Sequence, residues 1–287
     1  MSAQVGRFVT SKDGTKIWAD DAGNKEGIPV IFIHGLACTG HAWDKQFHNP
    51  ALLENLYMVR YELRGHSRSD YPWGAEWYTQ QKYAEDFMAV CEGFGLKKPF
   101  VCGWSLGAAT VCDVAQIFGP DIIAGVIFAG GPVITHSHHS NFSHAELRSN
   151  FPSFLDPSGD KQPQAAHVFV DSCLKYPARD LPYETRLKWL GGYLMQPPSI
   201  RKWTFSRAQE WDKWEKEFAS KTPHLLVQGR EDKHSDTEKM LPIAQGVLPH
   251  MEIKIIEDIG HAPAYEAAEE HDAYLLDFVL RVSGKKA

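Results

Sequence analysis

The 287-residue chain lacks the features that mark several large classes of protein. It has no excess of positive charge, because 30 Lys and Arg residues oppose 36 Asp and Glu residues and the formal net charge is −6. Surfaces that bind nucleic acid are basic, so this balance argues against a nucleic-acid partner. Internal repeats and low-complexity tracts are also absent from the sequence, which excludes solenoid and fibrous architectures.

Long hydrophobic segments are missing too. The longest apolar run, Ile122 to Ile134, covers about 13 residues and contains three Gly and a Pro, whereas a membrane-spanning helix needs roughly 20 apolar residues. Met1 to Phe8 lacks the basic stretch and the apolar core of a secretory signal. We therefore expect a soluble, cytoplasmic protein with no membrane partner.

Cysteine is scarce and shows no paired spacing. The chain has five Cys and no CxxC motif, and Cys91, Cys102 and Cys112 lie inside apolar segments. Free thiols in such segments act as small hydrophobic residues, which is typical of a reducing compartment. A chain of this length buries enough apolar surface to fold without a disulfide or a structural metal.

The sequence does contain a repeated alternation of buried strands and amphipathic helices. Continuous apolar runs, typical of strands buried on both faces, occur at 29–33, 57–61, 99–102, 122–129, 225–227 and 253–256. A two-stranded hairpin is predicted around Asp13-Gly14. Apolar residues at helical spacing occur at 83–94, 108–118, 237–247 and 267–282. This alternation predicts an α/β fold with a mostly parallel, eight-stranded sheet and helices on both faces.

One segment interrupts the alternation. Residues 132–221 contain no buried-strand pattern, and helical patches rich in Trp, Tyr and Pro are predicted at 167–174, 184–194 and 201–218. We interpret the chain as one core domain, 1–131 and 222–287, with a helical cap inserted at 132–221.

A group of histidines lies near the start of this insertion, at His136, His138, His139 and His144. Metal sites combine such residues at fixed spacings with further ligands, and this spacing matches none of them well. The sequence therefore predicts a solvated loop here, and no metal site.

The motif Gly103-Trp104-Ser105-Leu106-Gly107 follows a buried strand and opens a helical segment. This is the pattern of a nucleophile elbow, in which Ser occupies a sharp turn with its hydroxyl above the sheet. The two Gly residues are needed because a Cβ at either position would collide with the neighbouring strand or helix. The alternative is a Gly-rich turn of a nucleotide-binding fold, but no G-x-G-x-x-G or P-loop accompanies the motif. Ser105 is thus the predicted nucleophile.

The partners of a serine nucleophile follow in a defined order along the chain. Asp232 comes after the strand predicted at 225–227, with Glu231 and Asp236 as alternative acids, and His261 comes after the last predicted strand. Histidine is the natural base for a Ser hydroxyl at neutral pH. The order Ser105, Asp232, His261 is the one expected for a hydrolase with this topology.

Two backbone N–H groups are predicted to bind the oxyanion of an acyl-transfer reaction. One belongs to Leu106, the residue after the nucleophile, and the other to Leu36, which follows the strand ending at His34-Gly35. A plain polar turn is the alternative interpretation of His34-Gly35.

Aromatic residues are candidates for contact with a substrate. Trp104 lies beside the nucleophile, and Trp189, Tyr193 and Trp203 lie in the predicted cap together with Trp211 and Trp214. Packing onto the core is the default for each of them, but a cap over an active site usually lines it. We select Trp104, Trp189, Tyr193 and Trp203 as predicted substrate contacts.

With these residues identified, the sequence resembles the α/β-hydrolase superfamily from Lys16 to Val282. The resemblance rests on His34-Gly35, the stretch Glu62-Leu63-Arg64-Gly65-His66-Ser67-Arg68-Ser69, Ser105, Asp232 and His261. The sequence is most similar to the branch with a helical cap, which holds small carboxylesterases, lactonases, cofactor-free haloperoxidases or perhydrolases, and carbon–carbon bond hydrolases. It departs from the usual D-x-R-G-x-G-x-S pattern at Glu62 and Ser67, and Ala108 stands where a second Gly is common. These departures leave the subfamily open.

The resemblance implies a serine hydrolase that cleaves an ester-type bond, as a carboxylesterase or lactonase, through an acyl-enzyme and without a metal or organic cofactor. Ser105 excludes epoxide hydrolases and haloalkane dehalogenases, which use Asp at the elbow. We expect a mostly apolar, ester-like small molecule as substrate. Perhydrolase or carbon–carbon hydrolase activity on the same triad is one alternative, and a small-molecule receptor with this fold is another. The sequence does not distinguish a monomer from a homodimer.

Overall fold

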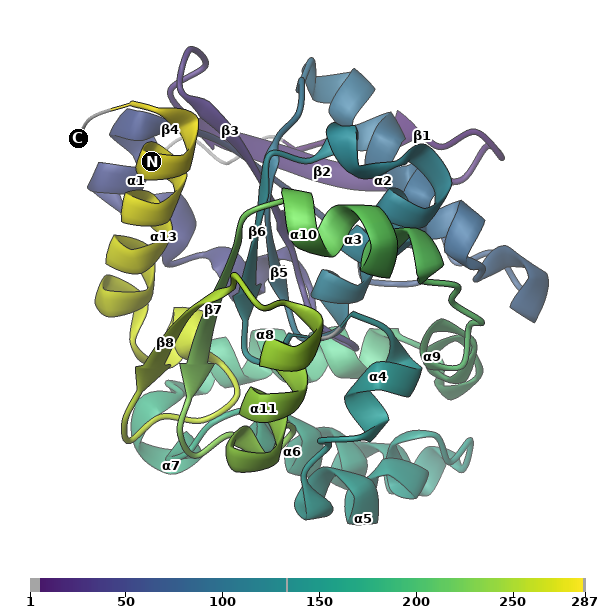
Figure 1. The fold of residues 1–287 in the computed structure, drawn as a ribbon. Helices are drawn as coiled ribbons and strands as arrows, with labels where there is room; N and C mark the ends of the chain where they lie inside the picture. Colours follow the sequence, from purple (N-terminus) through teal and green to yellow (C-terminus); the bar gives the residue numbers. More distant parts are fainter. Residues whose placement is uncertain (1–5, 133, 286–287) are drawn as a thin grey trace.

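The computed structural model describes residues 6–132 and 134–285. An eight-stranded sheet with the strand order β1-β2-β4-β3-β5-β6-β7-β8 forms its centre (Figure 1). The strands are β1 (Arg7–Thr10), β2 (Lys16–Gly23), β3 (Ile28–Ile33), β4 (Leu56–Tyr61), β5 (Phe100–Trp104), β6 (Gly125–Ala129), β7 (His224–Gly229) and β8 (Glu252–Ile256). β2 pairs antiparallel with β1 and β4, and the other neighbours pair in parallel. The predicted fold class is confirmed.

The central strands are buried on both faces of the sheet. In β3, Val30 and Phe32 belong to one apolar cluster, whereas Ile31 and Ile33 belong to a second cluster on the opposite face. Successive side chains of a strand point to opposite sides, so a strand between two apolar layers needs apolar residues at every position. This is why the strands are visible in the sequence as continuous apolar runs.

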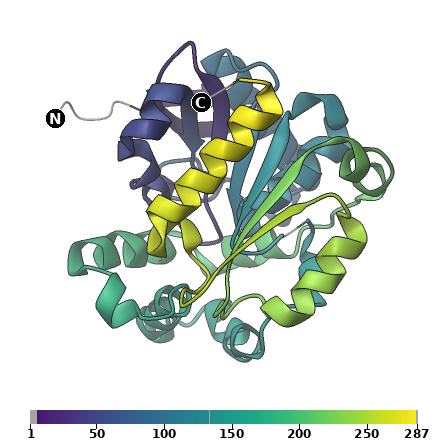
Figure 2. The same ribbon diagram turned by 60° about the vertical axis from the view of Figure 1, so that its left-hand side comes forward.

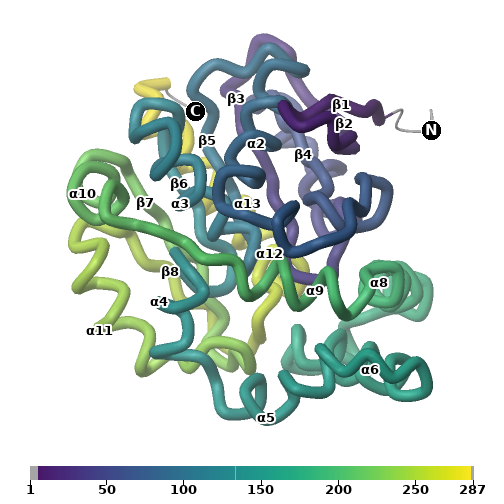
Figure 3. The backbone as a smooth tube through the Cα atoms, turned by 90° about the vertical axis from the view of Figure 1, so that its right-hand side faces the viewer, coloured from purple at the N-terminus to yellow at the C-terminus, as the bar shows by residue number. Residues whose placement is uncertain are grey.

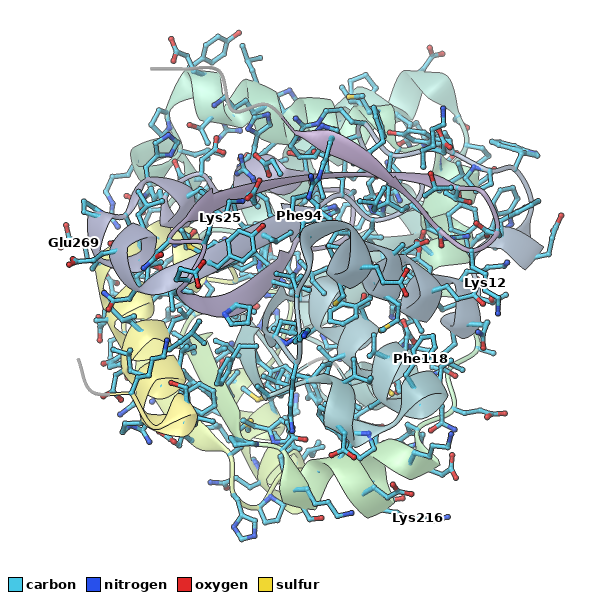
Figure 4. The ribbon with its side chains drawn as sticks, turned by 90° about the horizontal axis from the view of Figure 1, so that it is seen from above. Lys12, Lys25, Phe94, Phe118, Lys216 and Glu269 are labelled. Carbon is cyan, nitrogen blue, oxygen red and sulfur yellow. The ribbon has the colours of Figure 1, made fainter. Side chains whose placement is uncertain are left out.

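Helices cover the sheet on both sides. One face carries α1 (Pro50–Asn55), α12 (Pro263–Glu266) and α13 (Ala268–Ser283), and the other carries α2 (Gln80–Phe94), α3 (Leu106–Phe118) and α11 (Thr237–Val247). Figure 2 shows α13 in yellow, running along its face beside α1. Seen from above, Glu269 of α13 and Phe118 of α3 lie on opposite sides of the molecule (Figure 4). The four core helices predicted from apolar spacing correspond to α2, α3, α11 and α13.

The connection from β6 to β7 contains the inserted helices. They are α4 (His136–Ser140), α5 (Ala145–Phe154), α6 (Gln162–Ser172), α7 (Pro177–Asp180), α8 (Tyr183–Met195) and α9 (Pro198–Phe205). We call these six helices the cap. Figures 1 and 3 show them together at the lower end of the molecule, toward which the parallel strands point. α6 and α8 correspond to the helices predicted at 167–174 and 184–194.

The prediction of a solvated loop at the first histidines of the insertion is wrong. His136–Ser140 forms α4, and both His138 and His139 are buried against Phe142. Thr135 caps this short helix by accepting a hydrogen bond from the backbone N–H of His138. Within the described residues, no group of three or more His, Cys, Asp and Glu side chains is arranged to hold a metal ion.

The helix predicted at 201–218 is confirmed at 201–205 and 212–218 but wrong at 206–211, where the chain leaves the cap. α9 ends at Phe205, and a π-helical turn (Trp214–Phe218) and α10 (Ala219–Lys221) follow only after an irregular segment. Side-chain bonds hold that segment against the core: the Gln209 amide donates to Asp113 of α3 at 2.7 Å, and the Gln80 amide of α2 donates to the Glu210 carbonyl at 2.7 Å. Trp214 is fully buried against Phe128 of β6.

None of the helices in 6–132 and 134–285 combines the length with the apolar character that a membrane span requires. The longest, α13, has 16 residues and carries acidic residues in its first turn.

A buried histidine makes the stability of this core sensitive to acid. The ring of His224 on β7 stacks on Phe128, and burial lowers its pKa from 6.5 to about 3. In the unfolded chain His224 binds a proton near pH 6.5, whereas in the folded chain it stays neutral down to about pH 3. The free energy of unfolding therefore falls as the pH drops from 6.5 toward 3. His224→Phe should reduce this pH dependence by up to about 1.4 kcal/mol per pH unit. Urea unfolding at pH 7, 6 and 5 measures the free energy of unfolding of the wild type and of His224→Phe. An equal dependence of this free energy on pH in the two proteins would contradict the role given to His224.

Candidate active site

Ser105 lies at the junction of β5 and α3 in a strained backbone conformation. Its φ is 51° and its ψ is −120°, a region that residues with a side chain rarely adopt. Its N–H donates to the Ala129 carbonyl on β6 at 3.2 Å, and its carbonyl accepts from the N–H of Ala108 at 3.0 Å. The turn is thus fixed between a strand and a helix, and Ser105 lines the cavity at the carboxyl end of the sheet.

The two glycines of the elbow occupy positions without room for a side chain. A Cβ on Gly103 would lie 2.6 Å from the Cα of Ala108, and one on Gly107 would lie 2.3 Å from the Ile33 carbonyl oxygen. Close packing of Gly107 brings the N-terminus of α3 against the end of β3. Ala108, which departs from the usual pattern of the superfamily, is accommodated because Gly103 faces it.

His261 and Asp232 form a buried pair. His261 Nδ1 lies 2.8 Å from Asp232 Oδ2, and both side chains are almost completely buried. Glu231 instead forms an ion pair with Lys175, and Asp236 caps α11. Of the three acids considered from the sequence, Asp232 is therefore the one in contact with His261.

Further donors hold the Asp232 carboxylate in its charged form. Oδ1 accepts from the backbone N–H groups of His234 (2.6 Å) and Ser235 (2.9 Å), and Oδ2 accepts from the Gln228 amide at 2.8 Å. Burial alone would raise the pKa of Asp232, but the facing His261 and these hydrogen bonds hold it well below its usual range. A charged Asp232 fixes the proton of His261 on Nδ1 and leaves Nε2 as the basic nitrogen.

His261 is also held through its backbone and its ring faces. The Trp104 indole N–H donates to the His261 carbonyl at 2.8 Å, and the two rings lie 6.0 Å apart. A Cβ on Gly130 would lie 2.3 Å from the same carbonyl oxygen. His261 Nε2 is buried and has no hydrogen-bond partner among the described residues. This nitrogen thus bonds neither the Ser105 hydroxyl nor a competing group in the described part of the chain.

The loop after β3 presents the Leu36 N–H, and the stretch 62–69 holds this loop in place. Ala37 has a positive φ of 54°, and its N–H donates to His66 Nε2 at 3.3 Å. The Leu63 N–H donates to His34 Nε2 at 3.1 Å, and the Gly40 N–H donates to Glu62 at 3.2 Å. The N–H groups of Leu36 and Leu106 have no acceptor among the described residues, and both residues line the cavity.

A narrow cavity of about 40 Å³ lies between the elbow and the cap. Its apolar wall comes from Trp104 of the core and from Leu147, Phe151, Phe169 and Phe205 of the cap. Its polar lining includes Ser105 and the histidines His136, His139, His234 and His261. No Asp, Glu, Lys or Arg is among the lining residues that the structure describes.

The imidazoles on the cap side of the cavity are neutral at pH 7. Burial lowers the pKa of His139 from 6.5 to about 4, and burial lowers those of His136 and His234 well below the ordinary value. His136 Nε2 accepts from the Arg207 guanidinium at 3.1 Å. The cavity is thus polar at a few points but carries no formal charge on these three rings.

Of the four aromatic residues selected as substrate contacts, Trp104 lines this cavity. Trp189 packs on the far side of Trp104, with ring centroids 5.4 Å apart, and borders a smaller void of about 10 Å³. Tyr193 is fully buried within the cap beneath Arg201, and Trp203 packs on Trp73 and Tyr78 away from the site. The structure therefore places these three outside the cavity wall, because their helices turn them toward the core or toward other cap residues.

Comparison with known proteins shows the family of this chain. The model of the alpha/beta hydrolase fold matches residues 28–268. The chain belongs to the α/β-hydrolase fold family. Among solved structures, a candidate aryl esterase from Burkholderia cenocepacia is 26% identical with a TM-score of 0.88, covering 98% of this chain and 100% of that one. The esterase RhEst1 from Rhodococcus sp. ECU1013 is 23% identical with a TM-score of 0.83, covering 96% and 98%.

Curated relatives match over shorter stretches. A non-heme chloroperoxidase of Streptomyces lividans is 30% identical over 131 residues, which is 45% of this chain and 46% of that protein. A bifunctional esterase/perhydrolase of Acinetobacter calcoaceticus is 30% identical over 135 residues, 47% of this chain and 48% of that protein. The matched stretches thus span less than half the length of these two relatives.

Several lining residues of this α/β-hydrolase were not singled out from its sequence as parts of the site. Phe151, Phe169 and Phe205 come from three different cap helices, and His234 comes from the loop after β7. The cap residues carry no motif, because their meeting depends on how the helices pack. His234 had a signal in the sequence, since it lies two residues after Asp232.

The tight packing of the α/β-hydrolase elbow predicts opposite effects for two Gly→Ala changes. Gly107→Ala places a Cβ 2.3 Å from a backbone oxygen and should destabilise the fold by about 3 kcal/mol. Gly191→Ala, in the middle of α8 with no atom within 4 Å of the added Cβ, should stabilise it by about 1 kcal/mol. Denaturant unfolding of both variants measures the difference, and a stable Gly107→Ala protein would contradict the packing argument.

Proposed function

We propose that the protein is a serine carboxylic ester hydrolase that acts through an acyl-enzyme. The observation that carries this proposal is the buried His261–Asp232 pair, whose free Nε2 shares one cavity with the strained Ser105. The esterases among its structural relatives support the same reaction class.

The reaction begins with attack of Ser105 Oγ on the ester carbonyl, while His261 Nε2 takes the hydroxyl proton. Asp232 stabilises the imidazolium that forms. The N–H groups of Leu36 and Leu106 donate to the oxyanion, each contributing about 3 kcal/mol to transition-state stabilisation. The alcohol leaves with the proton from His261, and water then cleaves the acyl-enzyme by the same sequence of proton transfers.

The uncharged lining supports an uncharged, short acyl group as the part of the substrate that enters the cavity. A volume of about 40 Å³ has room for roughly three water molecules, which corresponds to a few carbon atoms. An ionised group in this space would have no opposite charge to pair with, and burying it would cost several kcal/mol.

Perhydrolysis is a second candidate, favoured by the relatives named as a chloroperoxidase and an esterase/perhydrolase. In that reaction hydrogen peroxide replaces water as the nucleophile that attacks the acyl-enzyme, and a peracid is released. Comparing acid and peracid release from one ester with added hydrogen peroxide separates the two activities.

Ser105→Ala should abolish ester hydrolysis and leave the fold intact. We expect kcat for p-nitrophenyl butyrate to fall by about 1,000-fold or more, with an unchanged thermal transition. A fluorophosphonate probe should label the wild type and the control Ser206→Ala, whose side chain lies on the surface, but not Ser105→Ala. Undiminished hydrolysis by Ser105→Ala would overturn the mechanism, and a ligand that raises Tm without turnover in the wild type would favour a receptor.

Two acyl groups of nearly equal length test the uncharged cavity. p-Nitrophenyl hemisuccinate carries a carboxylate where p-nitrophenyl butyrate carries a methyl group. The kcat/KM for the hemisuccinate should be lower than that for the butyrate by a factor of about 100. Leu147→Lys, at the cavity wall, should narrow this gap, whereas Leu187→Lys on the exposed face of α8 should not. Equal kcat/KM values for the two esters would contradict the assignment.

A further inference from the structure

The ring of His234 stacks on the ring of His261. Their centroids lie 4.0 Å apart with an angle of 29° between the planes, and His234 is 4% exposed. His234 comes from the loop that also supplies Asp232, and its backbone N–H donates to Asp232 Oδ1 at 2.6 Å. One short loop thus provides both the acid that holds His261 Nδ1 and a flat surface that packs against the His261 ring.

The cap fixes the orientation of the His234 ring. Ser172, the last residue of α6, donates its hydroxyl proton to the Phe169 carbonyl at 2.7 Å. Its Oγ lies 2.8 Å from His234 Nε2, so it accepts from the N–H at that nitrogen. This bond sets the tautomer of His234 and prevents rotation of its ring. The position of His234 is therefore determined from two sides, by the core loop and by the cap.

We propose that His234 is a positioning residue for His261, braced by Ser172 of the cap. This inference rests on the proposed function. Asp232 bonds only one nitrogen of His261, and a single bond leaves the ring free to tilt about it. The stacked ring of His234 on one side, with the Trp104 ring 6.0 Å away, restricts that tilt and keeps Nε2 directed into the cavity.

His234 also affects the charge that forms during the reaction. When His261 becomes an imidazolium, a neutral aromatic face next to it lowers the energy of the cation. The titratable groups that act on His234 are His261, Asp232, His139 of α4 and His144. Burial lowers the pKa of His234 well below its ordinary value, so the ring stays neutral while His261 cycles between its two forms.

His234→Leu keeps the volume and removes both the aromatic face and the bond to Ser172. We expect kcat for p-nitrophenyl butyrate to fall roughly tenfold, a part of the 100-fold or more that a well-placed base contributes, with KM within about twofold. The acid limb of the kcat/KM profile should move to lower pH, because the imidazolium of His261 loses a stabilising neighbour. His234→Phe, which keeps a ring, should restore the acid limb.

Ser172→Ala tests the bond to the cap separately. It should lower kcat by a smaller factor, and the double variant His234→Leu/Ser172→Ala should be no slower than His234→Leu, because Ser172 acts through His234. His224→Phe is the matched control: it replaces another buried histidine, on β7, and should leave kcat and the pH profile unchanged. An unchanged kcat and acid limb in His234→Leu, or a change in KM alone, would overturn the inference.

A measurement independent of turnover separates this inference from the proposed function. The Nδ1 proton between His261 and Asp232 should give a far-downfield proton NMR signal in the wild type. We expect it to exchange with water faster in His234→Leu and Ser172→Ala but not in His224→Phe. If the wild type neither hydrolyses esters nor reacts with a fluorophosphonate, the proposed function fails and this signal alone decides on His234. If the wild type is active and the signal is the same in all variants, only the positioning role fails.

Discussion

The site depends on the close approach of α3 to the end of β3. Gly107 has no side chain, so the first turn of α3 packs directly on the Ile33 and His34 carbonyls, where a Cβ would lie within 2.6 Å of both oxygens. This contact places the unpaired N–H groups at the start of α3 next to the loop that carries Leu36. It also requires the positive φ of Ser105, because the chain must reverse between β5 and α3 within one residue. The strained turn at Ser105 and the placement of the Leu36 and Leu106 N–H groups beside it are thus consequences of one steric constraint.

The surroundings of His261 depend on a different kind of interaction, the exclusion of water by aromatic rings. His261 is 1% exposed, with Trp104 and His234 beside its ring and Asp232 on Nδ1. In so dry an environment a second charged group would be costly, and the neighbouring imidazoles avoid this cost by remaining neutral. Asp232 keeps its charge because four donors converge on its two oxygens. The site therefore combines one fixed negative charge with rings that hold none.

Features of the fold and site that depend on residues close together in the sequence could be predicted, whereas features that depend on contacts between distant residues could not. The strands of the sheet were visible because a strand buried on both faces must be apolar throughout, and the elbow was visible because its two glycines are steric requirements within five residues. Asp232 and His261 were selected through their places after strands, and the structure brings these two side chains into contact. The break in the helix at 206–211 was not predictable, since Gln209 and Glu210 bond there with Asp113 and Gln80, which lie far away in sequence. The cap side of the cavity wall was missed for the same reason: Phe151, Phe169 and Phe205 meet only once three cap helices have packed.

The cap contacts the residues around the candidate site as well as forming part of the cavity wall. Ser172 of α6 bonds to His234 and Trp189 of α8 packs on Trp104, while the amide of Gln196, between α8 and α9, lies 2.9 Å from His66 Nε2. His66 in turn accepts from the Ala37 N–H of the loop that carries Leu36, and Trp104 donates to the His261 carbonyl. A displacement of the cap would therefore disturb His261 and the Leu36 loop together. The contacts that close the cavity are thus the same contacts that hold His261 and the Leu36 loop, so any motion of the cap that opened the cavity would also loosen the site.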